Sequence, residues 1–144
     1  MEHNYLITVL GIQEVDGEKD SVEVITEGDV VTKNDHTYIS YKEYNEDDPK
    51  IYSTNLIKIE DDKKVTVIRK GEFESRLILE EGKRHQCYYR TPVGNMMIGI
   101  YTESVNISLN EKGGKLNLKY YLDFNNDLVS NNELKIKVKE KVIE

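Results

Sequence analysis

The strongest constraint on the fold of this sequence is an alternation of apolar and polar residues with a period of two. The alternation is clearest over residues 115–124, in which apolar side chains occupy every even position and Asn117, Lys119, Tyr121 and Asp123 lie between them. Successive side chains of a β-strand point to opposite faces of the sheet. The segment is therefore predicted to be a strand with one buried and one solvent-facing side.

Further segments along the chain show the same alternation less regularly. With the segment above, they predict strands at residues 5–13, 21–33, 37–44, 51–60, 65–69, 73–79, 84–91, 95–109, 115–124 and 132–142. No stretch has a helical period of useful length, and alanine, the best helix former, is absent from the sequence. Within 21–33, Gly28 stands between two acidic residues and indicates a β-bulge that bends the strand.

Short turn signals separate the predicted strands. The clearest are Asp16-Gly17, Asn34-Asp35, Gly113-Gly114 and Asn125-Asn126. Short connections are typical of hairpins, whereas parallel strands need long crossover connections. The sequence therefore predicts an antiparallel meander.

A long twisted sheet must bury one of its faces, and it usually does so by curling or by splitting into two layers. The predicted fold is all-β: an antiparallel meander closed into a barrel of about 8–10 strands, in which the first and last strands pair and leave no free edge. A two-layer sandwich is the alternative. Neither a repeat nor a linker divides the sequence, so we expect a single β-barrel domain over residues 1–144.

The charge of the chain argues against nucleic acid as a partner. The sequence has 20 Lys and Arg against 27 Asp and Glu, a formal net charge of −7, whereas phosphate binding needs clustered basic residues. Lysines gather at Lys135, Lys137 and Lys139 between Glu133 and Glu140, and we interpret them as the solvated face of a strand. An acidic chain is also expected to avoid anionic membranes.

Sequence features of a secreted or membrane protein are missing. Cys87 is the single cysteine, which excludes an intramolecular disulfide. The first residues include no basic region, and no apolar run is long enough for a signal peptide or a membrane span. We therefore expect a cytoplasmic protein.

Several motifs occur in an order that is not generic for β proteins. In chain order they are Ile39-Ser40-Tyr41-Lys42-Glu43, Val65-Thr66-Val67-Ile68-Arg69-Lys70-Gly71, Tyr89-Arg90-Thr91-Pro92-Val93-Gly94, Tyr101-Thr102, Tyr120-Tyr121-Leu122-Asp123 and Ser130-Asn131-Asn132-Glu133-Leu134-Lys135-Ile136. In this succession, over nearly its whole length, the chain resembles the YwiB-like family of small bacterial β-barrel proteins. The resemblance implies a barrel similar to that of the calycins (lipocalins and relatives) and a bacterial, cytoplasmic protein. It implies no function and no catalytic or ligand-binding residues.

Metal binding and covalent catalysis have little support in the sequence. His85 and Cys87 share one face of a predicted strand, but two ligands do not make a zinc site, and we expect no metal and no cofactor. Residues two apart on a strand are separated by about 6.5–7 Å, a spacing that disfavours a direct Cys–His hydrogen bond. We interpret Cys87 as a core residue, predict no catalytic residues, and regard an enzyme as less favoured than a binding protein.

The best candidates for a site are polar residues that lie an even number of positions from apolar ones on the same predicted strand, and so share their face of the sheet. Glu43 is in phase with Ile39 and Tyr41, and Arg69 is in phase with Val65 and Val67. The same reasoning gives the full set of candidate ligand-binding residues: Tyr41, Glu43, Arg69, His85, Tyr89 and Thr102. Because burying a charge is costly unless it is paired, we expect a Glu43–Arg69 ion pair on the inward face.

Two hypotheses of function remain. The first is a non-enzymatic β-barrel that binds a small amphipathic or anionic ligand in its lumen, with Arg69, helped by His85 and tyrosine hydroxyls, at the polar end. The second is a scaffold with a filled core that acts through its surface or as a homodimer, its inward polar residues lying at the barrel mouths or pairing structurally. A lumen of several hundred Å³ would support the first hypothesis, and a filled one would exclude it.

Overall fold

Ten antiparallel strands make up the computed structural model, which describes residues 4–110 and 112–141. The strands are β1 (Tyr5–Val15), β2 (Glu18–Lys33), β3 (His36–Tyr44), β4 (Tyr52–Asp61), β5 (Lys64–Lys70), β6 (Glu74–Glu80), β7 (Arg84–Thr91), β8 (Gly94–Asn110), β9 (Gly113–Phe124) and β10 (Asp127–Glu140). Each overlaps a predicted strand. The last begins earlier than predicted, because the turn before it is tight, and Val142 lies outside the described residues.

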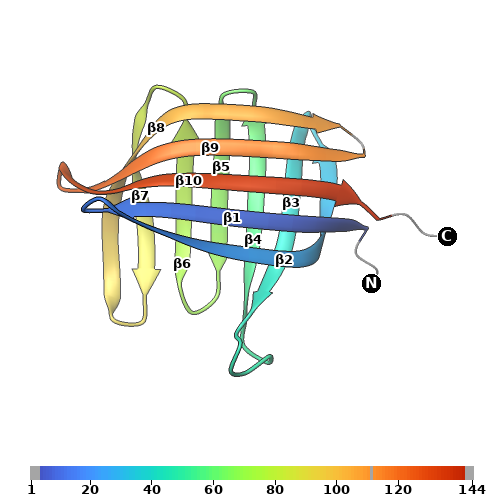
Figure 1. Cartoon of the computed structure of the whole chain (residues 1–144), viewed down its shortest axis with the longest axis horizontal. Coiled ribbons are helices and arrows are strands. Elements are labelled where there is room, and N and C mark those ends of the chain that lie inside the picture. Colours follow the sequence, from blue (N-terminus) through green and yellow to red (C-terminus); the bar gives the residue numbers. More distant parts are fainter. Residues whose placement is uncertain (1–3, 111, 142–144) are drawn as a thin grey trace.

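The strands close into a barrel in the order β1-β10-β9-β8-β7-β6-β5-β4-β3-β2. The closing contact joins the two ends of the chain, and Tyr5 of β1 is paired with Glu140 of β10 on one side and with Gly28 of β2 on the other. Figure 1 shows β1 beside β10, with the start of β1 and the end of β10 at the same side of the molecule. The predicted closed antiparallel meander is confirmed.

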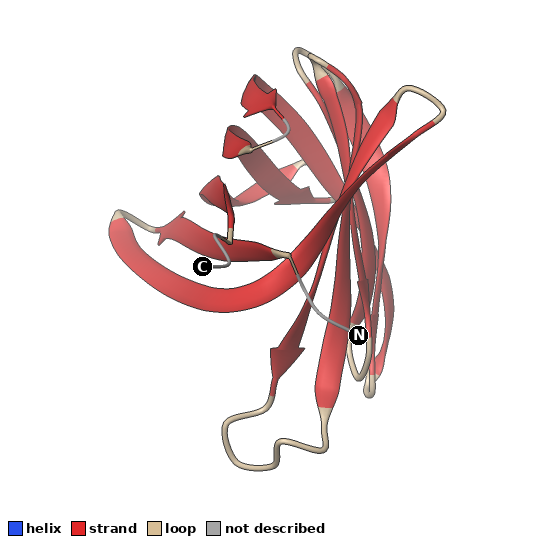
Figure 2. Ribbon diagram, turned by 90° about the vertical axis from the view of Figure 1, so that its right-hand side faces the viewer, coloured by secondary structure: helices blue, strands red, loops and turns tan. Residues whose placement is uncertain are grey.

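The barrel is flattened into two layers that two long strands connect. In Figure 1, β1, β9 and β10 run across the front and β3 to β7 cross behind them. The view of Figure 2 shows the strong curvature that lets strands pass between the layers. Strand β2 pairs with β1 up to Gly28 and with β3 from Gly28 onward, and β8 changes from β7 to β9 around Gly99. Each layer change therefore occurs at a glycine, as is common at barrel corners.

The bulge predicted at Gly28 is absent, because the register of β2 runs through this residue without a shift. A Cβ atom here would collide with the side chain of Ile7 and the carbonyl oxygen of Ser40. Glycine therefore allows a close approach of strands at the corner rather than an extra residue in the ladder.

Three of the predicted turns are two-residue hairpins with positive φ at both central residues. They are Asp16-Gly17, Asn34-Asp35 and Asn125-Asn126, residue types that tolerate the left-handed region. The turn predicted at Gly113-Gly114 is wrong, because both residues lie in β9 and are paired with β8 and β10. A Cβ atom on Gly114 would run into the backbone of Ser108 and Leu109, so glycine is again needed for close packing.

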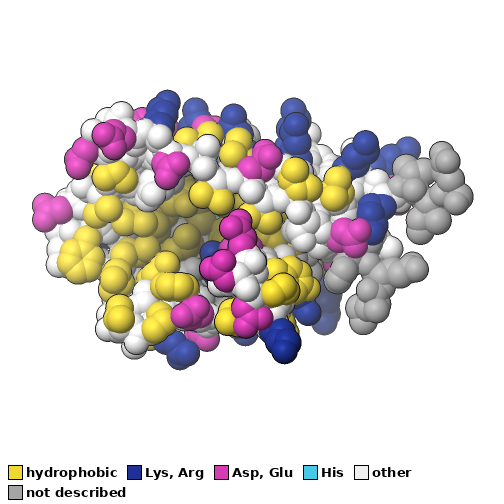
Figure 3. All heavy atoms as spheres, turned by 60° about the horizontal axis from the view of Figure 1, so that its bottom comes forward, with side chains coloured by type: hydrophobic (Ala, Val, Ile, Leu, Met, Phe, Trp, Pro, Cys, Tyr) yellow, Lys and Arg dark blue, Asp and Glu magenta, His cyan; other side chains and the backbone are white. Residues whose placement is uncertain are grey.

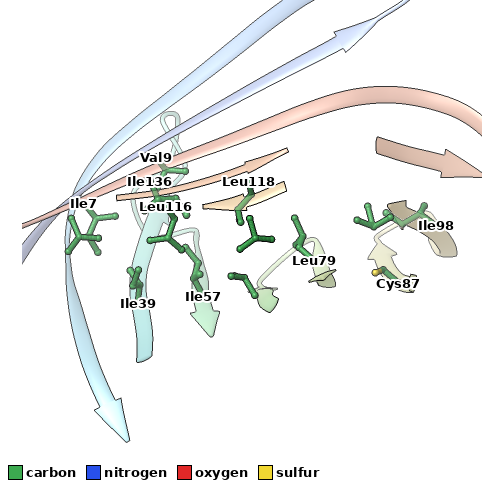
Figure 4. Packing of buried hydrophobic residues seen from close by; sticks show 14 residues of the cluster. Ile7, Val9, Ile39, Ile57, Leu79, Cys87, Ile98, Leu116, Leu118 and Ile136 are labelled. Atoms are coloured by element: carbon green, nitrogen blue, oxygen red, sulfur yellow. The ribbon is translucent and has the colours of Figure 1, made fainter. Parts of the chain in front are cut away.

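The core lies between the two layers. Its buried apolar residues are Ile7, Val9, Ile39, Ile57, Val65, Leu79, Cys87, Ile98, Ile100, Val105, Leu116, Leu118, Ile136 and Val138. Figure 4 shows these side chains pointing from both layers into the space between them. Burying an Ile or Leu side chain stabilises a fold by about 1.5–3 kcal/mol, so the alternation in the sequence accounts for the two-sided core. No helix that could span a membrane occurs in the described ranges.

Candidate functional site

A row of five polar side chains crosses neighbouring strands of the back layer. In the strand register, Tyr41 of β3 lies opposite Asn55 of β4, Asn55 opposite Arg69 of β5, Arg69 opposite Ser75 of β6, and Ser75 opposite Tyr89 of β7. Directly opposed residues of neighbouring strands share one face of the sheet. This polar row therefore lies on the inward face, which it shares with the core.

The polar row lines a cavity in the lumen with a volume of about 300 Å³. Glu43 also lines it, and the other lining residues are Gly11 and the valine, leucine and tyrosine side chains of β1, β2, β5, β6, β9 and β10. Figure 3 shows a hollow in the face it presents, with hydrophobic side chains along its walls. This lumen cavity is of the size that the ligand-binding hypothesis requires.

The predicted ion pair between Glu43 and Arg69 is confirmed. Nη2 of Arg69 donates a hydrogen bond to Oε2 of Glu43 over 3.0 Å. The side chains are 40% and 32% exposed, respectively, so the pair lies at the edge of the lumen rather than deep in the core. It also borders a second, smaller cavity of about 160 Å³, lined by Ser53 and Glu72 among others.

Among the described residues, two hydrogen-bond donors on side chains that line the lumen cavity have no partner. They are Nδ2 of Asn55 and Nε of Arg69, both of which are buried. Asn55 as a whole is only 5% exposed. A buried donor without an acceptor costs about 1–3 kcal/mol, and the large majority of buried polar atoms in proteins are satisfied. Both donors belong to side chains that line the lumen cavity.

Two tyrosines of the cavity remain protonated over a wide pH range. The pKa of Tyr41 is raised to about 12, first by burial and then by the charge of Glu43, against the opposing charge of Arg69. Burial alone raises the pKa of Tyr120 to about 12. Both hydroxyls are therefore neutral groups at physiological pH, able to donate or accept a hydrogen bond.

The structure brings together four of the six predicted site residues, namely Tyr41, Glu43, Arg69 and Tyr89, which all line the lumen cavity. His85 and Thr102 are not among its lining residues. Nε2 of His85 lies 2.9 Å from Oε1 of Glu80. Thr102 is fully buried, and its hydroxyl has no hydrogen-bond partner among the described residues.

Three polar residues of the cavity were missing from the predicted set: Asn55, Ser75 and Tyr120. Asn55 carries a signal in the sequence, because it has the same parity as Ile57 and Ile59. Ser75 and Tyr120 carry a weaker signal in the sequence. Serine is common on outer faces, and Tyr120 fits the apolar alternation of its own strand.

The described residues include no group of three or more His, Cys, Asp and Glu side chains placed to hold a metal ion. Cys87 is buried in the core, and burial raises the pKa of its thiol. Its sulfur accepts a hydrogen bond from the backbone N–H of Ile78, while the ring of His85 is engaged with Glu80. These contacts fit a packing role for Cys87.

The geometry defines a class of protein: a closed antiparallel β-barrel whose lumen cavity is apolar except for a polar row and one ion pair. A family model described as "Domain of unknown function (DUF1934)" matches residues 7–136, and the chain belongs to this family. The structure is similar to the crystal structure of the ywiB protein from Bacillus subtilis, with a TM-score of 0.84 and 19% sequence identity, covering 97% of this chain and 93% of that one. The predicted resemblance to the YwiB-like family is thereby confirmed. No curated protein matches the chain.

Proposed function

We propose that the protein is a non-enzymatic binding protein that holds one small amphipathic molecule in its lumen cavity. The observation that carries this proposal is a pair of buried donors, on Asn55 and Arg69, that have no partner among the described residues and belong to the polar part of an otherwise apolar cavity. A filled structural core gains nothing from such donors, because each costs free energy until it meets an acceptor. A ligand with a polar acceptor and an apolar body would satisfy both parts of the cavity.

The cavity volume limits the size of this ligand. Since a water molecule occupies about 30 Å³ in the liquid, a volume of about 300 Å³ has room for a molecule of roughly ten non-hydrogen atoms. Each buried CH₂ group would contribute about 0.8 kcal/mol. Walls formed by residues such as Val67 and Leu77 would thus hold a chain of several carbons, with the head at the polar row.

The experiment that tests the proposal is an NMR titration with octan-1-ol, which has an acceptor oxygen and a hydrocarbon chain of suitable length. We expect saturable shifts confined to backbone amides around the lumen cavity. Val67→Trp should fill the cavity and abolish them. Ile68→Trp is the matched control, because the next residue along the strand points to the opposite face. Shifts that do not saturate, or that persist in folded Val67→Trp, would exclude lumen binding.

A further inference from the structure

We infer that the lumen cavity selects a ligand with an uncharged, amide-type head over a carboxylate, and that Glu43 sets this selection. The inference rests on the proposed function and specifies the chemistry of the ligand that the same cavity takes.

The first argument is the charge of the cavity. Glu43 and Arg69 are the charged residues among those that line it, and they neutralise each other across 3.0 Å. The adjoining cavity adds the carboxylate of Glu72. A ligand carboxylate would therefore lose its hydration without finding a net positive charge, which is strongly unfavourable in a partly buried site. It would also lie close to the carboxylate of Glu43.

The second argument is the pattern of hydrogen-bonding groups. Nδ2 of Asn55 and Nε of Arg69 are buried donors that lack a partner in the described part of the chain, and both side chains line the cavity. A ligand carbonyl oxygen has two lone pairs and can accept from two donors. Glu43 uses Oε2 for Arg69, and an ionised carboxylate has further acceptor capacity on its second oxygen. An amide group presents a carbonyl acceptor and an N–H donor side by side, and thus matches both halves of the site.

The size of the cavity gives matched probes. Octanamide and octanoate have the same number of non-hydrogen atoms, close to the roughly ten that the volume allows, and they differ in the charge of the head. At neutral pH octanoate is ionised, because carboxyl pKa values lie near 4.

The test measures the dissociation constants of both probes by calorimetry for the wild-type protein and two variants. We expect the wild type to bind octanamide at least ~10-fold more tightly than octanoate, because the ionised head of octanoate loses hydration beside an ion pair that has no net positive charge. Glu43→Gln should improve octanoate binding by about 10-fold or more, because the charge of Arg69 is then no longer neutralised. It should leave octanamide binding within about 3-fold, because glutamine retains an acceptor oxygen. Glu74→Gln is the matched control: Glu74 pairs with Arg90 at 3.5 Å but does not line the cavity, and neither affinity should change.

The outcomes separate this inference from the proposed function. If octan-1-ol binds in the lumen but the wild type takes octanoate as tightly as octanamide, the inference is wrong and the proposed function stands. If folded Glu43→Gln has the same ratio of octanamide to octanoate affinity as the wild type, Glu43 does not set the selection. If none of the three probes binds, the proposed function fails and the inference fails with it. The comparison within the wild type does not depend on the folding of any variant.

Discussion

Asn55 is a residue whose side chain should lower the stability of the protein but favour the proposed binding of a ligand. Its side chain is almost fully buried, yet Nδ2 donates to nothing in the described structure. Leucine has a similar size and no polar atom, so Asn55→Leu should raise the free energy of unfolding by about 1–2 kcal/mol. The same change should weaken the binding of octanamide, because the ligand loses a donor. Chemical denaturation and calorimetry measure the two effects, and destabilisation together with unchanged binding would contradict the role of Asn55.

Arg69 should be less important for stability than its inward position suggests. A fully buried ion pair costs about 3–5 kcal/mol when one partner is removed, but these side chains are 40% and 32% exposed. We therefore expect Arg69→Met to destabilise the protein by about 1 kcal/mol. In a urea-unfolding cycle with Glu43→Gln, the coupling should be about 0.5–1 kcal/mol. A loss of several kcal/mol for Arg69→Met would show that Glu43 is effectively buried.

Parity in the sequence predicts the face on which a residue lies, but not its position along the barrel. It correctly placed Tyr41, Glu43 and Arg69 on the inward face, beside the apolar residues of their strands. His85 has the inward parity of Cys87, yet its ring contacts Glu80 instead of the lumen cavity. Which inward residues lie at the same level depends on the register between strands, and register follows from turns and bulges that alternation does not reveal.

At the scale of elements, the corner of β8 depends on Gly99. Arg84 of β7 donates two hydrogen bonds to Asp123 of β9, from Nε over 2.9 Å and from Nη2 over 2.7 Å. The register places Gly99 between these strands, and a Cβ atom on it would collide with the guanidinium of Arg84 and the carboxylate of Asp123. The bidentate pair of Arg84 and Asp123 thus occupies the space above Gly99, which a side chain at this position would fill.

Gly99→Ala should disrupt this bidentate pair and destabilise the protein by about 1 kcal/mol. In a background with both Arg84→Ala and Asp123→Ala, the same substitution should be neutral or slightly stabilising, because alanine restricts the unfolded chain more than glycine does. Thermal or urea unfolding of the four proteins measures the difference. An equal cost of Gly99→Ala in both backgrounds would mean that the backbone, and not the ion pair, requires the glycine.

The elements themselves were largely predictable, because alternation and turn residues act locally. All ten strands overlap predicted segments, and the turns predicted at Asp16-Gly17 and Asn34-Asp35 are present, with positive φ at their central residues. The errors concern glycine. The sequence predicts a bulge at Gly28 and a turn at Gly113-Gly114, whereas these residues permit close approaches inside strands. A glycine in a sequence can indicate that there is no room for a side chain, but the neighbouring atoms that occupy this room are known only from the structure.

At the scale of the whole molecule, closure depends on the last strand. Strand β10 pairs with β9 on one side and β1 on the other, and it supplies the buried residues Ile136 and Val138. Deletion of residues 132–144 should leave two free edges and open the core to water. We expect the truncated protein to lose its cooperative thermal transition and to bind an apolar dye. A cooperative melt at the wild-type temperature would show that closure by β10 is not needed for stability.

The lumen as a binding cavity is tested most directly by the NMR signals of two donors that are unpartnered within the described structure, Nε–H of Arg69 and Nδ2–H of Asn55. We expect both signals to shift along one saturating curve as octanamide is added, because both groups gain the same acceptor. Asn55→Leu assigns the side-chain amide signal by removing it. Saturating binding that leaves both signals in place, or no saturable change anywhere in the spectrum, would contradict the proposal that these donors hold the head of a ligand.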